Sequence, residues 1–292
     1  MADAGVAFET LEPQELARRL PDLQGGDIFR GIFGKRCGIL NPNRLAGFYA
    51  GEITRLGGQF QVGVEVTGFL RDHQGLLRGV KIGDREILAG QILVATGPWL
   101  AVTLALAGLT VPVVAVKRQL FALKAPAGPL NRLLHSRGFN PHGLLPFTIL
   151  PGEAYLRPAP AANAFIVGFA NEDQPPGLED RPVAEPEFFE TRILPQLERY
   201  LPIFRGAIPG QSWAGHYEDH PPDRIAFVDH LSGALVVGGA SGSGIMKADS
   251  LGRAAAGLYF GRSQVELGDG KSLNVADLGL QGRTLPPEEF VI

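Results

Sequence analysis

The sequence predicts an α/β protein in which a parallel-sheet module is interrupted by an antiparallel module. Residues 234–261 have the pattern of a strand, a glycine-rich loop and a helix. Residues 92–95 form a short, wholly apolar run, typical of a strand buried on both faces in a parallel sheet. Between these two stretches, residues 111–213 contain segments typical of an antiparallel meander.

The first strong element is a helix that begins after Asn41. Asn41 can cap it, and Pro42 suits its first position. The glycines at 57 and 58 end it. One apolar face recurs at helical spacing: Leu45, Phe48, Tyr49, Ile53 and Leu56.

Strands are predicted after this helix. Residues 60–69 alternate valine with other residues, which predicts a strand. Residues 76–82 and 86–88 predict a hairpin around Gly83 and Asp84. The apolar run 92–95 follows, and residues 100–106 then predict a helix.

The later elements follow from similar patterns. The interrupting module is expected to contain three strands and a helix kinked by Pro195. Two short apolar strands come after it, and from Gly268 onward the chain is expected to wind over the surface. The expected strands are 113–123, 153–157, 164–170, 225–228 and 234–237, and the expected helix is 186–201.

Composition bounds the class of protein. The chain has 292 residues, 45% of them hydrophobic and 20% charged, enough for one large or two closely packed domains. The net charge is −3 without a run of Lys or Arg, which argues against binding nucleic acid or an anionic membrane. The single cysteine, Cys37, excludes an internal disulfide. Because no signal peptide and no membrane span of about 20 apolar residues is evident, we expect a cytoplasmic protein.

The glycine loop is the strongest candidate site. Gly239, Gly242 and Gly244 precede a helix, so backbone N–H groups and a positive helix end meet at one point. This arrangement suits a phosphate or another electron-rich group. The alternative is a tight turn that needs positive φ angles. Ser241 and Ser243 between the glycines favour a polar site.

Five segments occur in a characteristic order. They are GILNP at 38–42, LVATGPW at 93–99, VKRQ at 116–119, YLRP at 155–158 with VG at 167–168, and GASGSGIMK at 239–247. In these segments the chain resembles the superfamily of D-amino-acid oxidase, sarcosine oxidase and glycine oxidase. These proteins are FAD-dependent amine oxidoreductases, and the resemblance extends from about residue 5 to residue 261.

The resemblance implies an incomplete FAD-binding domain, Rossmann-like and of the glutathione-reductase type, with an inserted antiparallel-sheet α+β substrate domain. Residues 38–110 and 220–264 would form the FAD-binding domain, 1–37 and 111–219 the substrate domain, and 265–292 a C-terminal tail. FAD is the implied cofactor. Its implied contacts are Val66 (through its backbone), Ala95, Thr96, Gly97, Trp99, Gly239, Ser241, Gly242, Ser243, Gly244, Ile245, Met246 and Lys247. Read without the resemblance, Trp99 is a packing residue and Met246 a core residue.

The chain departs from this family in one respect. The family begins with a strand, a G-x-G-x-x-G turn, a helix and an acidic residue for the ribose, and no such unit is present. Three explanations compete: a truncated or mis-started reading frame, an FAD site completed by a second polypeptide, or loss of FAD binding. The first is favoured and the second follows closely, because much of the flavin-facing pattern is intact.

Several polar side chains are candidates for contacting a substrate. A guanidinium binds a carboxylate through two hydrogen bonds, although a strand arginine can instead form a surface or interdomain ion pair. Lys247 would stabilise the negative charge of reduced flavin, as the resemblance implies, or be a solvated lysine. His216 and His220 stand four positions apart, but the prolines that follow argue against a helix, so no metal site is predicted. The candidates are Arg118, Tyr155, Arg157, His216 and Lys247.

The resemblance therefore implies an enzyme that oxidises the C–N bond of a small amine or amino acid, similar to sarcosine, glycine or a D-amino acid. A neutral amine would donate a hydride to flavin N5. The alternative is a non-catalytic or partner-dependent subunit of a heteromeric flavin dehydrogenase. A truncated remnant that cannot bind FAD alone is the third possibility.

Overall fold

The computed structural model describes residues 6–125, 128–170, 174–268, 270–281, 283 and 286–287. The chain forms two compact units, and it passes between them several times. Unit 1 comprises Met1–Leu40, Arg118–Asp173 and Arg181–Gly215. Unit 2 comprises Asn41–Lys117, Gln174–Asp180 and His216–Ile292.

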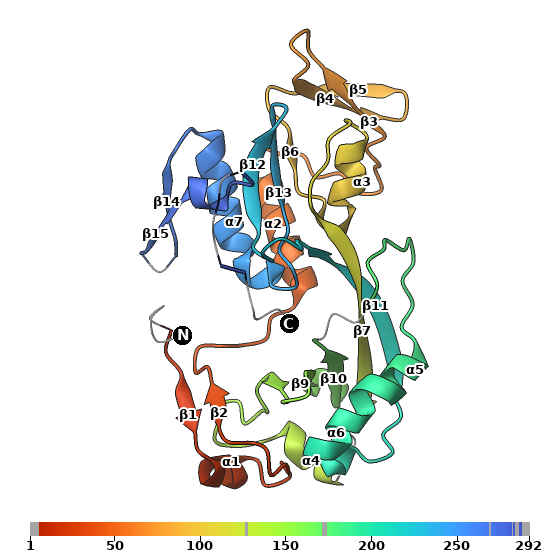
Figure 1. Cartoon of the computed structure of the whole chain (residues 1–292), viewed down its shortest axis with the longest axis vertical. Coiled ribbons are helices and arrows are strands. Elements are labelled where there is room, and N and C mark those ends of the chain that lie inside the picture. Colours follow the sequence, from red (N-terminus) through yellow and green to blue (C-terminus); the bar gives the residue numbers. More distant parts are fainter. Residues whose placement is uncertain are drawn as a thin grey trace. The chain divides into compact units, whose positions relative to one another are not determined.

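A five-stranded sheet provides the framework around the core of unit 1 (Figure 1). β10 pairs antiparallel with both β7 and β9, and β8 pairs antiparallel with β9. The predicted antiparallel module is thereby confirmed. In spatial order the strands are β11 (Gln211–Asp219), β7 (Val114–Lys124), β10 (Ala164–Phe169), β9 (Ala154–Ala159) and β8 (Thr148–Ile149).

Helices cover this core, and all six residues of β10 are buried. The predicted helix at 186–201 is confirmed as consecutive helical segments, with a π-helical turn at Phe189–Ile193 shortly before Pro195, and the kink itself stays a prediction. Four phenylalanines fill the interior: Phe121, Phe165, Phe189 and Phe204. The remaining elements are β1 (Glu9–Leu11), β2 (Gly31–Phe33), α1 (Pro13–Arg19), α4 (Gly128–Leu134), α5 (Pro186–Phe188) and α6 (Leu194–Tyr200).

Unit 2 is built around the sheet β12–β13–β6, along which α7 lies (Figure 1). β13 pairs parallel with β6, as predicted, and antiparallel with β12. The predicted hairpin around Gly83 is confirmed as part of a three-stranded meander. The elements are β3 (Gly68–Arg71), β4 (Leu77–Ile82), β5 (Arg85–Leu88), β6 (Leu93–Val94), α3 (Leu100–Ala105), β12 (Phe227–Leu231), β13 (Ala234–Gly238) and α7 (Gly244–Tyr259).

The prediction of a strand at 60–67 was wrong. Strand β3 begins only at Gly68, and Gly63 has a φ of +68°, which breaks the extended conformation. A strand also needs a neighbouring backbone to pair with. Thr67 at the end of the segment donates its N–H to the Lys81 carbonyl, but no described strand pairs with residues 60–66. The prediction that 92–95 is buried on both faces was also wrong, because Leu93 is 51% exposed.

The helix α2 (Pro42–Arg55) begins as the sequence predicts. The Asn41 side chain accepts a hydrogen bond from the Arg44 N–H at 3.1 Å. Much of its apolar face, however, is exposed in the described structure: Leu56 is 74% exposed and Phe48 60%, and no residue of the helix is fully buried. The periodicity therefore predicted the helix correctly, but did not show what packs on it.

The end of the chain is more structured than expected. β14 (Gln264–Glu266) and β15 (Ser272–Asn274) form a hairpin, and Val275 after it is buried. Gly257 of α7 leaves room for this hairpin, since a Cβ there would lie 2.3 Å from Cγ1 of Val265. Part of the segment after Gly268 thus packs on α7 rather than winding over the surface.

Candidate functional site

The loop 239–243 joins β13 to α7 in an unusual backbone conformation. Gly239 and Gly242 have φ angles of +70° and +81°, and Ser241 between them has +46°. Glycine adopts such angles freely, whereas a serine there is strained by about 1 kcal/mol. A Cβ on Gly239 would lie 2.9 Å from Cβ of His220. The loop is therefore fixed closely against the chain that follows β11.

The hydroxyl groups of this loop are used inside it. Ser241 Oγ accepts a hydrogen bond from the His220 N–H at 3.0 Å and donates one to the Gly239 carbonyl at 3.2 Å. Ser243 Oγ donates to the Ala240 carbonyl at 2.9 Å. Both serines are buried. These hydroxyls are therefore taken, and the N–H groups of Ala240, Ser241 and Ser243 also donate within the protein. A ligand would meet the N–H groups further along, at the start of α7.

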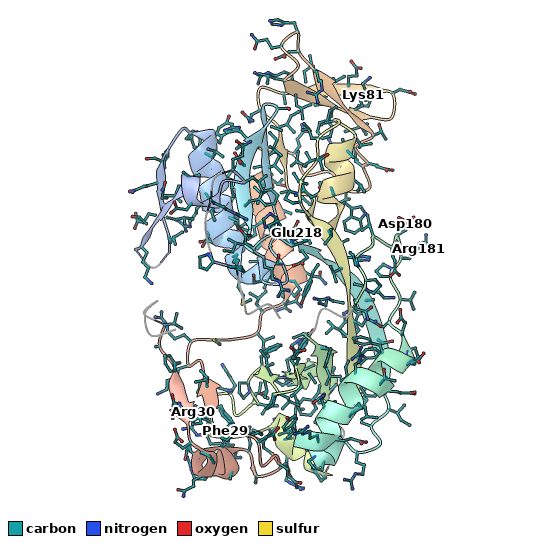
Figure 2. The ribbon with its side chains drawn as sticks, viewed as in Figure 1. Phe29, Arg30, Lys81, Asp180, Arg181 and Glu218 are labelled. Carbon is teal, nitrogen blue, oxygen red and sulfur yellow. The ribbon has the colours of Figure 1, made fainter. Side chains whose placement is uncertain are left out.

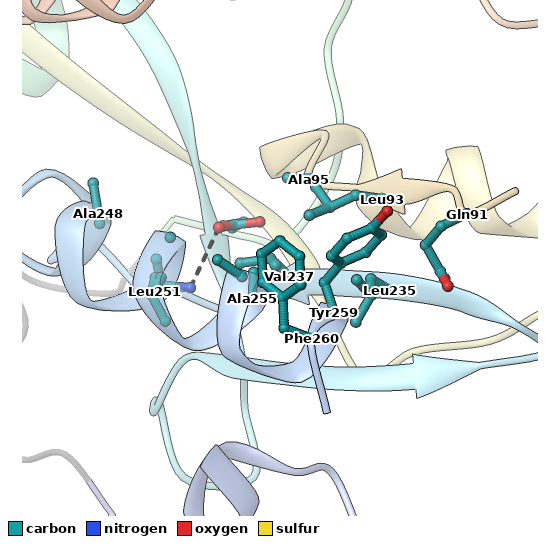
Figure 3. Close-up of a pocket in the computed structure, with 15 residues that line it drawn as sticks. Gln91, Leu93, Ala95, Leu235, Val237, Ala248, Leu251, Ala255, Tyr259 and Phe260 are labelled. Carbon is teal, nitrogen blue, oxygen red and sulfur yellow. Dashed lines mark hydrogen bonds between the residues drawn. The ribbon is translucent and has the colours of Figure 1, made fainter. Parts of the chain in front are cut away.

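Glu218, labelled in Figure 2, holds the loop from β11. Its carbonyl accepts the Ser241 N–H at 3.0 Å, and its Oε1 accepts the Ala240 N–H at 3.4 Å, the dashed line in Figure 3. Oε2 is buried and has no hydrogen-bond partner among the described residues. Burial raises the pKa of Glu218, and hydrogen bonds from the Ala240 and Gly239 N–H groups oppose part of this rise. Glu218 was not among the predicted site residues, although an acid directly after an aromatic strand segment was a usable signal.

His220, which packs against Gly239 of the loop, belongs to a buried cluster with Asp223 and Arg283. His220 Nδ1 lies 2.7 Å from Oδ1 of Asp223, and Arg283 Nη2 donates to the same oxygen at 2.8 Å. Arg283 also donates to the Ile225 carbonyl at 2.8 Å. Burial acts to raise the pKa of Asp223, but the hydrogen bonds from Ile225 N–H, His220 and Arg283 outweigh it and hold that pKa below its usual range. The cluster fixes His220 next to Gly239.

Replacing Asp223 with asparagine is expected to destabilise the protein by about 2 kcal/mol at pH 7, because Arg283 loses a buried anionic partner. The pKa of Asp223 is lower in the folded state than in the unfolded state. Its contribution is therefore present above the unfolded pKa of about 4 and is lost as the pH falls through the folded pKa. Urea unfolding at pH 7 and pH 3 should show a smaller acid-induced loss for Asp223→Asn than for wild type.

The matched control is Asp249→Asn, which removes an exposed ion pair with Arg253. Exposed pairs contribute less than about 1 kcal/mol, so this variant should stay close to wild type at both pH values. An equal loss of stability in the two variants would contradict the role given to the cluster.

The N-terminus of α7 is open towards the loop. Its N-cap, Ser243, makes no side-chain cap, and its first turn contains no acidic residue. The N–H groups of Gly244 and Ile245 find no acceptor among the described residues. The positive end of this 16-residue helix is therefore suited to a phosphate or another electron-rich group. Lys247 is half-buried in the same turn, and its backbone N–H donates to the Ser243 carbonyl at 3.2 Å.

A groove of about 690 Å³ begins beside this loop (Figure 3). Glu218, Ala240 and Gly244 line its polar end. Apart from Gln91, the rest of its wall is apolar and comes from β6, β13, α7 and residues next to them. Its volume is within the range of small-molecule sites. The apolar lining residues include Leu93, Ala95, Leu235, Val237, Leu251, Ala255, Tyr259 and Phe260.

The predicted flavin contacts of the region around β6 lie in the same unit as the loop. Ala95 lines the groove, Thr96 is exposed, and Gly97 has a φ of +55° where the chain turns into α3. Trp99 is 46% exposed, so its side chain is partly covered, and its role stays a prediction. Val66 is half-buried in the irregular segment before β3.

The first turn of α7 exposes two of the predicted contacts. Ile245 is 45% exposed and Met246 65%. The alternative interpretation of Met246 as a core residue is therefore wrong.

Unit 1 carries the predicted carboxylate ligands of β9. Tyr155 and Arg157 share one face of the sheet, because side chains alternate along a strand. A Cβ on Gly168, opposite Tyr155, would lie 2.4 Å from the Tyr155 hydroxyl oxygen, so the glycine makes room for this ring. Arg157 is half-buried and forms no ion pair with a described carboxylate. Burial lowers the pKa of Arg157, and the interaction with Tyr155 opposes part of this shift.

The other two predicted substrate ligands are placed differently. Arg118 lies half-buried on β7, in unit 1. His216 lies on β11, in unit 2, and its Nε2 accepts the backbone N–H of Glu179 at 3.2 Å. Nε2 of His216 is therefore already used in a hydrogen bond to the backbone of the segment around Glu179.

Metal binding and membrane crossing find no support in the described residues. No group of three or more of their His, Cys, Asp or Glu side chains is placed to hold a metal ion. No helix in the described part of the chain is long and apolar enough to cross a membrane.

Comparison with known proteins gives matches over most of the chain. A family model described as FAD dependent oxidoreductase matches residues 1–258. The curated FAD-dependent oxidoreductase domain-containing protein 1 of Xenopus laevis is 27% identical over 170 residues. This match covers 56% of the chain and 30% of the relative, so the chain matches less than a third of that relative's length.

Solved structures with a similar fold include a dehydrogenase and an oxidase. L-proline dehydrogenase from P. horikoshii is 22% identical, the match covers 90% of this chain and 67% of that one, and the TM-score is 0.75. Glycine oxidase from Geobacillus kaustophilus is 19% identical, the match covers 97% and 69% of the two chains, and the TM-score is also 0.75. At these identities the likeness shows the fold, and it confirms the predicted fold class.

Proposed function

The chain belongs to the family of FAD-dependent oxidoreductases, whose model matches most of its length, and from this premise we propose that it oxidises the C–N bond of a small amine or amino acid. FAD is the cofactor of this family. When bound, FAD supplies at N5 the acceptor for a hydride from the α-carbon, and the resulting imine is hydrolysed by water. The chain's own residues bind and orient the substrate and shield it from water.

The residues around the loop 239–243 fit FAD. Two features support this: the open N-terminus of α7 and the buried Glu218 oxygen without a partner among the described residues. The N–H groups of Gly244 and Ile245 would donate to an electron-rich part of the cofactor, and Lys247 would add positive charge. We accordingly assign residues 38–110 and 220–264 to cofactor binding.

Arg157 carries the assignment of the substrate class. A half-buried guanidinium without a carboxylate partner among the described residues is suited to the carboxylate of an amino acid. Tyr155 on the same face of β9 supplies a hydroxyl beside it. We therefore favour amino acids over amines that lack a carboxylate.

Anaerobic reduction of the bound flavin tests the proposal. The FAD-loaded chain is mixed with sarcosine, glycine, L-proline, D- and L-amino acids, and amines without a carboxylate. At least one amino acid should bleach the visible flavin absorbance and yield the corresponding keto acid or aldehyde. If chemically reducible bound flavin is not bleached by any of these compounds, the chain does not act on this class of substrate.

The exposed apolar surface of unit 2 favours a second candidate, a subunit that needs a partner. Leu56 and Phe48 of the α2 region and Leu93 of β6 are each more than half exposed, and the outer edge of β6 is unpaired among the described residues. A strand and helix of a second polypeptide would pair with β6, cover α2 and complete the FAD site.

Co-expression tests this candidate. The chain is produced alone and together with the product of a neighbouring reading frame that encodes a strand, a G-x-G-x-x-G turn and a helix. Retention of FAD only in the co-expressed sample supports the subunit. Equal retention in both samples excludes the need for a partner.

A further inference from the structure

The carboxyl group of Glu218 has two oxygens in different situations. Oε1 accepts the Ala240 N–H, the Glu218 carbonyl accepts the Ser241 N–H, and the Gly239 N–H also interacts with the carboxyl group. Oε2 is buried without a hydrogen-bond partner among the described residues. An unsatisfied buried carboxyl oxygen costs about 1–3 kcal/mol or more, so a residue that serves only to hold the loop does not account for it.

Oε2 lies close to Gly238, which has no side chain that could donate a hydrogen bond to it. A Cβ added to Gly238 would lie 3.5 Å from Oε2, but the same Cβ would lie 2.2 Å from Cδ2 of Leu100. No side chain therefore fits at this position. Glu218 also lines the polar end of the groove, together with Ala240 and Gly244 at the start of α7 (Figure 3).

We propose that Glu218 accepts, through Oε2, a hydrogen bond from a hydroxyl or N–H group of bound FAD. This inference rests on the proposed function and adds to it a residue outside the family segments that predicted the site. The same carboxyl group then holds the loop through Oε1 and the cofactor through Oε2. Occupation of the groove is thereby coupled to the conformation of residues 239–241.

Glutamine at this position separates the two roles. In Glu218→Gln the amide oxygen can still accept the Ala240 N–H, while an N–H₂ donor replaces the acceptor Oε2. FAD affinity should fall by on the order of tenfold, because a charge-assisted hydrogen bond is lost. The melting temperature of the apoprotein should stay within a few degrees of wild type, and Glu218→Asp, which keeps the carboxylate, should recover part of the affinity.

Two control variants complete the titration. Asp219→Asn removes the same charge from the next residue of β11 and should bind FAD as wild type does. Ser241→Ala removes the hydroxyl that bonds His220 and Gly239, so it should lower the melting temperature of the apoprotein. This pattern distinguishes a variant that loosens the loop from one that removes a cofactor contact.

Fluorescence quenching of FAD, titrated with each apoprotein, gives the dissociation constants. Weaker binding by Glu218→Gln with unchanged apoprotein stability supports the proposal. Equal affinity of wild type, Glu218→Gln and Asp219→Asn overturns it and leaves the proposed function intact. If wild type itself does not bind FAD, the proposed function of the isolated chain fails, and this role of Glu218 fails with it. If Glu218→Gln does not fold, Glu218→Asp decides, because wild-type affinity in that shortened variant would contradict a contact through Oε2.

Discussion

Replacing Arg157 with alanine is expected to raise the KM for an amino-acid substrate by on the order of 100-fold, equivalent to about 3 kcal/mol. The half-buried guanidinium is the candidate ligand of the substrate carboxylate. Alanine removes the two hydrogen bonds that the guanidinium would donate to that carboxylate. Steady-state kinetics with the best amino acid from the bleaching screen gives this value. The KM of Arg157→Lys should lie between those of wild type and Arg157→Ala, since lysine keeps the positive charge but not the planar guanidinium group.

Two comparisons show whether the effect is specific. An amine without a carboxylate should react with Arg157→Ala and with wild type at similar KM. Arg18→Ala removes an exposed arginine of the same unit that pairs with its helix neighbour Glu15, and it should leave the kinetics unchanged. If KM rises equally for substrates with and without a carboxylate, Arg157 stabilises the fold and does not bind the substrate carboxylate.

Replacing Gly239 with alanine is expected to destabilise the protein by about 3 kcal/mol. About 1–2 kcal/mol of this comes from the left-handed backbone, with φ at +70°. The remainder comes from overpacking, because the new Cβ would lie 2.9 Å from Cβ of His220 and 3.1 Å from the ring of Phe227. Urea unfolding measures the loss, and FAD binding should weaken in the same variant.

Gly252→Ala is the matched control for Gly239→Ala. Gly252 lies inside α7, is exposed, and would have nothing within 4 Å of an added Cβ. Alanine there should stabilise the helix by about 0.5–1 kcal/mol. If both variants have the same stability, the loop does not need the conformation described for it.

Local signals predicted the elements that depend on short-range physics. The Asn41 cap, the turn at Gly83, the helix around Pro195 and the loop before α7 are all determined by neighbouring residues. The strand at 60–67 failed because valine alternation says nothing about whether a second backbone is available for pairing.

The candidate site was predicted less completely than the fold. The glycine loop and the open end of α7 lie within one continuous stretch, so their pattern is visible in the sequence. Glu218 bonds Ala240 across 22 positions of the chain, and Arg283 bonds Asp223 across 60. Because tertiary packing alone brings these residues together, no local pattern marks them as parts of one site.

The measurement that tests the central claim most directly is the visible absorption spectrum of the purified chain, before and after addition of FAD and desalting. We expect a flavin spectrum that is shifted from that of free FAD and survives desalting, because the loop 239–243 and the N-terminus of α7 would hold the cofactor. Loss of all flavin on desalting, from protein that remains folded and soluble, would contradict the account.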